Sequence, residues 1–371
     1  MRADSIGLYV HVPFCVRKCA YCDFASFSAT DFPERTEYVE ELCREIDSYK
    51  ERNLTVCTLF FGGGTPSLLT PNEFEKIMLH IREAFTVLPS VEFTLEANPK
   101  TLTREKLYRY IACGVNRLSI GLQSIHENEL KKLGRIHDYK AFLDSYTLAR
   151  ELGINNINVD LMYGIPEQTA DSFDETLRAI TSLSPEHISV YGLIIEAGTP
   201  FFAERETLAL PSEECECDMY YSAAKLLADA GYEHYEISNY AKHGFECLHN
   251  LGYWRSCEYI GVGLSAYSYL DGRRFGNTRL PREYLSGVRI ESDEVLGKPD
   301  IAYEFAMLGL RLSEGFSLSE YRARFGYDFL VGREEFVKRL ADEGYLTLTG
   351  DRLALTERGF YVSNPILAEL L

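Results

Sequence analysis

The stretch Gly7-Leu-Tyr-Val-His-Val-Pro-Phe-Cys15-Val-Arg-Lys-Cys19-Ala-Tyr-Cys22 places a short apolar segment directly before three closely spaced cysteines. Residues 7–12 predict a β-strand. The cysteines follow the spacing CxxxCxxC, and thiolates are the soft ligands that iron–sulfur clusters require. The stretch therefore predicts a metal cluster at the end of the first strand.

Three cysteines can hold a four-iron cluster and leave one of its irons open. We expect Cys15, Cys19 and Cys22 to hold a [4Fe-4S] cluster whose open iron takes the amino and carboxylate groups of S-adenosylmethionine (SAM). An electron from such a cluster cleaves the sulfonium, and the protein positions and shields this chemistry. The alternative is a three-cysteine zinc site, which would need a fourth ligand such as His11.

The first half of the chain alternates strand and helix patterns. This order predicts βα units with a parallel sheet, and six such units predict a partial (β/α)6 barrel of the α/β class. Thr70-Pro71, Thr103 and Asp171 are expected to precede helices. The expected strands are residues 7–12, 56–61, 91–96, 117–121, 157–161 and 187–192, and the expected helices are residues 35–49, 72–85, 104–112, 139–151 and 172–181.

Candidate ligand-binding residues follow several of these strands. Gly62-Gly63-Gly64-Thr65-Pro66, Glu96 and Asp160 stand at the ends of their strands. The carboxyl ends of parallel strands form the active face of a barrel. Glycines let the backbone approach a ligand, and carboxylates accept hydrogen bonds from hydroxyl or ammonium groups. A glycine run can equally be a plain turn.

The pattern changes after about residue 200. We expect one helix over residues 213–230, and then a segment rich in tyrosine and glycine with short strand-like pieces over residues 232–290. Helices over residues 302–312, 317–324 and 333–342, followed by a hairpin near Gly350, predict a small winged-helix-like α+β domain. The expected division is a barrel over residues 1–200, a barrel extension over 201–297 and a C-terminal domain over 298–371.

The amino-acid composition of the chain limits the kinds of partner that it can bind. Hydrophobic residues make up 46% and charged residues 25% of the chain, and the net charge is −18. An acidic surface repels phosphate backbones, so we expect no nucleic-acid partner. No apolar run approaches the length of a membrane span, and the N-terminus lacks the pattern of a signal peptide. The sequence therefore predicts a cytoplasmic protein.

With Tyr21 before the last cysteine, the CxxxCxxC motif resembles the radical-SAM superfamily. The motif Tyr9-Val-His-Val-Pro-Phe-Cys15 is similar to that of the oxygen-independent coproporphyrinogen III oxidase family. The resemblance implies a SAM site and assigns no catalytic residue. The residues implied to contact SAM are Tyr9, Tyr21, Phe24, Gly64, Thr65, Pro66, Glu96, Gln123, Arg135 and Asp160.

Two features resemble the haem chaperone HemW subgroup of that family. The oxidase has a fourth cysteine where this chain has Phe24, and only 14 residues precede Cys15. His249-Asn250-Leu-Gly-Tyr253-Trp254 fits the motif HNxxYW, which the subgroup associates with haem. Imidazole can ligate haem iron, and aromatic rings can pack on a porphyrin. The residues implied for haem are His249, Asn250, Tyr253 and Trp254, with His234, His243 and Cys247 as alternative ligands.

The leading hypothesis is a chaperone that binds haem and transfers it to target haemoproteins. Its expected partners are haem, haem-acceptor proteins and an electron donor for the cluster. Docking at membrane-bound partners and a haem-dependent dimer are further alternatives. The competing hypotheses are the oxidase itself, which decarboxylates propionates, and a radical-SAM enzyme acting on another substrate.

Overall fold

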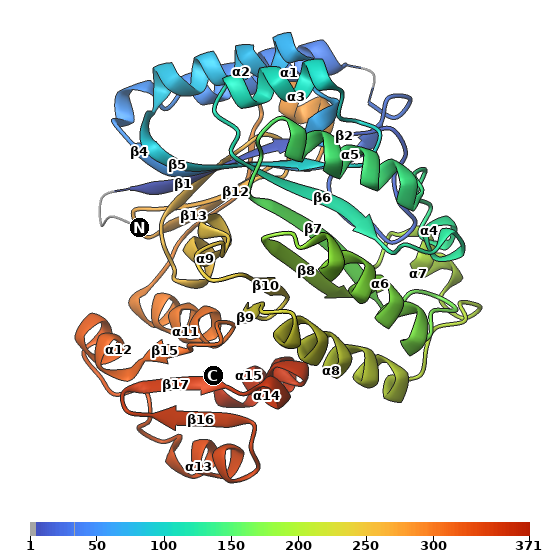
Figure 1. Ribbon diagram of the computed structural model, residues 1–371. Coiled ribbons are helices and arrows are strands. Elements are labelled where there is room, and N and C mark those ends of the chain that lie inside the picture. Colours follow the sequence, from blue (N-terminus) through green and yellow to red (C-terminus); the bar gives the residue numbers. More distant parts are fainter. Residues whose placement is uncertain (1–4, 33) are drawn as a thin grey trace.

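Six parallel strands form the centre of the computed structural model, which describes residues 5–32 and 34–371 (Figure 1). Each is followed in sequence by at least one helix, and together they form the expected partial (β/α)6 barrel. The strands are β1 (Ile6–Val12), β4 (Thr55–Gly63), β5 (Thr86–Ala97), β6 (Arg117–Gln123), β7 (Ile157–Tyr163) and β8 (His187–Gly192). The helices between them are α1 (Arg35–Asp47), α2 (Pro71–Ala84), α3 (Arg104–Ala112), α4 (Glu127–Lys132), α5 (Tyr139–Glu151) and α6 (Ala170–Leu183).

The sheet extends beyond the barrel at both edges. Its order is β14-β13-β12-β11-β1-β4-β5-β6-β7-β8-β10-β9, so β14 and β9 are edge strands and the barrel stays open. Strand β11 runs parallel to β1. The strands beyond β11 at one edge and beyond β8 at the other run antiparallel to their neighbours in the sheet. The added elements are α7 (Pro200–Glu204), α8 (Glu213–Asp229), β9 (Glu233–Glu236), β10 (Asn239–Ala241), α9 (Leu248–Trp254), β11 (Tyr259–Val262), β12 (Tyr267–Leu270), β13 (Arg273–Asn277), α10 (Pro281–Leu285) and β14 (Ile290–Val295).

The C-terminal elements pack beside the barrel around their own apolar cluster (Figure 1). Five helices and a three-stranded sheet of order β15-β17-β16 give the expected winged-helix-like arrangement. The elements are α11 (Lys298–Gly309), β15 (Phe316–Ser317), α12 (Leu318–Phe325), α13 (Glu334–Asp342), β16 (Leu346–Thr349), β17 (Arg352–Leu355), α14 (Glu357–Tyr361) and α15 (Ser363–Leu370).

The predicted helix starts are confirmed at two of three positions. Thr70 forms a capping box with Glu73, and the Thr103 hydroxyl accepts a hydrogen bond from the Lys106 amide. The prediction for Asp171 is wrong. Helix α6 begins earlier, because Thr169 accepts from the Ser172 amide and leaves Asp171 inside the first turn.

Side chains along the barrel strands alternate between the apolar core and the interior of the barrel. Leu8, Val10 and Val12 of β1 are buried in the apolar core, whereas Tyr9 and His11 line cavities in the barrel. Successive side chains of a strand point to opposite faces. The aliphatic side chains therefore pack with the helices outside the sheet, and the polar side chains face the interior.

Helix α9 closes the interior at the amino ends of the strands, in a segment where the sequence predicted only short strand-like pieces. The Glu92 carboxylate on β5 accepts hydrogen bonds from the backbone amides of Leu248 (3.0 Å) and His249 (3.1 Å) at the start of α9. On β4, Thr58 Oγ1 lies 2.9 Å from His249 Nδ1. These contacts attach α9 to the floor of the barrel.

Glu92→Ala removes the carboxylate that satisfies two buried amides. We expect the substitution to lower the free energy of unfolding by about 2–4 kcal/mol, because both amides lose a charged partner. Urea denaturation measures this loss. Glu206, whose side chain is 84% exposed, provides the control, and Glu206→Ala should change stability by less than about 0.5 kcal/mol. Equal effects of the two substitutions would contradict the role of Glu92.

Candidate functional site

A cavity of about 540 Å³ lies inside the barrel and gathers most of the predicted site residues. A site of this volume is typical of a cofactor pocket. Cys19 and Pro66 do not line it, and Pro66 is buried at the start of a short 3-10 helix (Pro66–Leu68). The predicted residues that line the cavity are Tyr9, Cys15, Tyr21, Cys22, Phe24, Gly64, Thr65, Glu96, Gln123, Arg135, Asp160, His249, Asn250 and Tyr253.

The cysteine loop is held by neighbouring elements. The Ala20 amide donates to the Leu133 carbonyl just after α4, at 3.0 Å, and the Phe201 amide of α7 donates to the Ala20 carbonyl, also at 3.0 Å. Cys15 ends the short strand β2 (Phe14–Cys15), which pairs with β3 (Phe27–Ser28). The loop is therefore positioned by backbone hydrogen bonds on several sides.

The thiol groups fit a cluster better than a single zinc ion. Zinc–sulfur bonds of about 2.3 Å would bring tetrahedral ligand sulfurs to within about 4 Å of one another. Among the described residues, the groups with three metal-ligating atoms within 4.8 Å of one another do not include Cys15, Cys19 and Cys22. A cluster binds each thiolate through a different iron, so it suits wider spacing.

The thiols are also partly desolvated. Cys15 Sγ lies 3.8 Å from Thr65 Oγ1, and Cys22 Sγ lies 3.9 Å from Ser26 Oγ. Burial raises the pKa of both thiols. Because thiolates are the metal ligands, cluster binding must release their protons.

The glycines at the end of β4 are required by close packing. A Cβ on Gly63, whose φ is +111°, would lie 2.5 Å from Cε1 of His11. A Cβ on Gly64 would lie 2.7 Å from the Phe14 carbonyl oxygen. These contacts are closer than real Cβ atoms allow, so the glycine run lets β4 reach the cysteine loop.

Polar groups from several strand ends converge on the cavity. Glu96 Oε2 accepts from the Gly63 amide at 3.0 Å. Arg135 donates to Asn98 Oδ1 at 2.5 Å and to the Tyr21 hydroxyl at 2.9 Å. Gln123 Oε1 and Arg135 Nε are buried without a hydrogen-bond partner among the described residues. A carboxylate, a guanidinium and an unpaired amide oxygen in one cavity suit a ligand with both charged and hydroxyl groups.

The two interior carboxyl groups have raised pKa values. Burial, with a further contribution from Asp160, raises the pKa of Glu96 to about 8. Burial also raises the pKa of Asp160, although hydrogen bonds from Asn158, Ser189 and Ser119 oppose the shift. Glu96 is therefore mostly protonated at neutral pH when no cationic ligand is present.

Some residues that line the interior were not predicted from the sequence. Arg117, Ser119, Asn158 and His187 line the cavity at or near the amino ends of β6, β7 and β8. Arg117 is 2% exposed, and the one hydrogen bond that its side chain donates to a described residue is a long one of 3.4 Å, from Nη1 to Thr94 Oγ1. The available signal was an arginine at the start of a predicted strand, two residues before Ser119 on the same strand face.

The HNxxYW motif lies on α9, at the floor of the cavity. His249 is 3% exposed, and its second ring nitrogen, Nε2, lies 2.9 Å from the Tyr253 hydroxyl. Burial, together with Arg117, lowers the pKa of His249 to about 3. Trp254 does not line the cavity and instead packs against Arg311, whose guanidinium carbon is 5.9 Å from the ring centroid. In this arrangement both nitrogens of His249 already have partners.

The alternative haem ligands do not gather around this cavity. His234 Nδ1 lies 2.9 Å from a Glu357 carboxylate oxygen, and the His234 ring stacks on Tyr240. The His243 side chain is 91% exposed. Cys247 is fully buried, with its sulfur 3.7 Å from the Glu92 carboxylate. The structure therefore places the three residues in separate environments.

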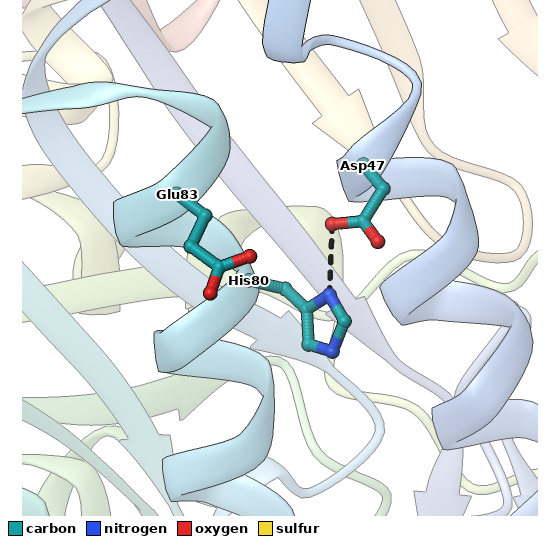
Figure 2. Close-up of side chains that lie close together, drawn as sticks. All are labelled: Asp47, His80 and Glu83. Carbon is teal, nitrogen blue, oxygen red and sulfur yellow. Dashed lines mark hydrogen bonds and ion pairs between the residues drawn. The ribbon is translucent and has the colours of Figure 1, made fainter.

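Asp47, His80 and Glu83 form a separate cluster on the outer helices (Figure 2). His80 Nδ1 lies 2.8 Å from Asp47 Oδ1. The Lys50 ammonium lies 3.1 Å from Asp47 and 2.9 Å from Glu83. Because a lysine already neutralises these carboxylates, the cluster is a surface ion-pair network.

Glu96→Gln tests the raised pKa of this carboxyl group. Between pH 4.5, its ordinary pKa, and pH 8, folded Glu96 keeps a proton that the unfolded chain releases. Wild-type stability should therefore fall relative to Glu96→Gln as the pH rises through this range, by up to about 1.4 kcal/mol per pH unit. Urea unfolding at several pH values, without cluster or SAM, measures the difference. A constant difference between the two proteins would show that the pKa of Glu96 is ordinary.

Comparison with known proteins places the chain in a family. Residues 9–180 match the model of the Radical SAM superfamily, and residues 296–362 match the HemN C-terminal domain. The structure is similar to coproporphyrinogen III oxidase (HemN) from Escherichia coli, with a TM-score of 0.88, 24% identity and coverage of 99% of this chain and 90% of that chain. This likeness shows a shared fold.

Curated relatives match over nearly their whole length. Heme chaperone HemW from Escherichia coli is 38% identical over 99% of this chain and 98% of the relative. Heme chaperone HemW from Lactococcus lactis is 35% identical over 98% of this chain and 96% of the relative. Heme chaperone HemW from Bacillus subtilis is 34% identical over 98% of this chain and 98% of the relative. The chain therefore belongs to the HemW family of radical-SAM proteins.

Proposed function

We propose that this protein is a haem chaperone that binds haem and transfers it to haem-requiring proteins. The observation that carries the proposal is the 38% identity to a heme chaperone HemW, which extends over 99% of the chain. Phe24 supports the same choice, because it stands where the related oxidase has a fourth cysteine. No described helix is long and apolar enough to cross a membrane.

A [4Fe-4S] cluster and SAM are the proposed resident cofactors. Cys15, Cys19 and Cys22 would hold the cluster, which supplies an electron to the SAM sulfonium when both are bound. The unpaired Gln123 Oε1, the Glu96 carboxyl group and Arg135 can orient the polar groups of SAM. The Tyr21 hydroxyl holds Arg135 in place, at 2.9 Å.

Single Cys→Ser substitutions test the cluster ligands. We expect Cys15→Ser, Cys19→Ser and Cys22→Ser to lose most of the about four irons that a reconstituted chain holds, because each removes one of three thiolates. Iron analysis and visible absorbance after anaerobic reconstitution measure the loss. Cys217→Ser, a change at a half-buried cysteine on α8, should keep wild-type iron content. Full iron retention in any of the three variants would reject that cysteine as a ligand.

Haem titration and transfer test the chaperone function. We expect the Soret band of the anaerobically reconstituted protein to saturate at about one haem per chain. The loaded protein should then give up its haem to an apo-haemoprotein, which is measured from the absorbance of the acceptor. Absence of saturable binding would contradict the chaperone, and turnover of coproporphyrinogen III under the same conditions would instead identify the oxidase.

A further inference from the structure

A second cavity adjoins the cluster cavity and is separated from it by few side chains. Its volume is about 640 Å³, within the range of cofactor sites. Phe24, Glu96 and Tyr253 are among the residues that line both cavities. The rest of the wall includes residues of the loop after α9, strands β11–β13 and helix α11. We call this second cavity the aromatic groove.

Flat aromatic side chains dominate the wall of the groove. Tyr253, Tyr259, Tyr267 and Tyr269 line it, and the rings of Tyr253 and Tyr259 meet edge to face at 4.6 Å. Tyr267 is 49% exposed and Phe24 is 59% exposed. Large aromatic side chains left exposed around a cavity indicate a binding site for a ligand with broad apolar faces.

The groove also holds groups that suit iron and carboxylates. Cys257 and Met307 line it, and cysteine and methionine sulfurs are ligands of haem iron. Arg279 is exposed at the groove and forms no ion pair with a described carboxylate; its guanidinium donates a hydrogen bond of 3.4 Å to the Asp23 carbonyl. It is therefore free to bind a carboxylate. Arg274 differs, because Glu304 holds its guanidinium.

The HNxxYW motif connects to the groove through Tyr253. His249 is held between Thr58 Oγ1 and the Tyr253 hydroxyl, at 2.9 Å from each. Tyr253 lies between the two cavities and lines both. Within this geometry His249 acts as a positioning residue that orients Tyr253, and it offers no free nitrogen to a ligand.

We propose that haem binds in the aromatic groove, with a sulfur of Cys257 or Met307 on its iron and a propionate on Arg279. The inference rests on the proposed chaperone function and assigns its cargo site. Haem in this position would adjoin the cluster cavity across Tyr253 and Phe24. The HNxxYW helix would shape the groove without supplying the iron ligand.

Haem titrations of matched variants test the site. Tyr267→Glu places a charge in the groove and should weaken haem binding by at least about tenfold. Tyr108→Glu makes the same change at a 64% exposed tyrosine on α3 and should bind haem as wild type does. Circular dichroism and cluster content establish that both variants are folded. Equal haem affinity of the two variants would overturn the groove, while saturable wild-type binding would still support the chaperone.

Spectra of bound haem identify the iron ligand. Cys257→Ser should shift the Soret band if the ligand is a thiolate, and Met307→Leu should shift it if the ligand is a thioether. Cys57→Ser, at a cysteine outside the groove, should leave the band unchanged. His249→Gln should keep the wild-type Soret wavelength. A band that shifts in His249→Gln and in neither sulfur variant would overturn the proposal, and absence of saturable wild-type binding would overturn both the groove and the chaperone function.

Discussion

The alternation of side chains along six parallel strands is the constraint on which the rest of this molecule depends. One face of each strand is aliphatic and packs with the surrounding helices, as with Leu118, Ile120 and Leu122 of β6. The other face carries Arg117, Ser119 and Gln123, which line the interior. An interior with so many polar groups cannot collapse into a dry core, so the barrel keeps a chamber. The cofactor site is a direct result of this division.

Much of the fold could be predicted because its signals are local. Each parallel strand and the main barrel helices appear as apolar periodicities within a single short segment, and the structure confirms their order. Helix α9 could not be found in this way. It has only seven residues, and it is stabilised by Glu92 and Thr58, which lie 156 and 191 residues away in the chain. Contacts over such separations leave no periodic pattern.

The residues of the candidate functional site could likewise be predicted only in part. Three cysteines within eight positions, and polar residues at strand ends, are visible in the sequence, and the structure brings nearly all of them to one cavity. Arg117 and His187 were missed, because their importance depends on neighbouring strands that bury them. The environment of His249 was also hidden. An imidazole in a motif suggests a ligand, and only the three-dimensional arrangement shows that both its nitrogens are engaged.

The attachment of α9 to the barrel floor has a consequence for the order of folding. The cysteine loop is held by β3, Leu133 and Phe201, all of which precede α9 in the chain, whereas the floor joins β4 and β5 to a helix that emerges from the ribosome later. Loop-closure entropy delays such distant contacts. The nascent barrel therefore remains open at its base until residue 254 has been synthesised. During translation the interior is accessible from the amino ends of the strands. It is closed by α9 only after the cysteine loop at the opposite ends of the strands has formed.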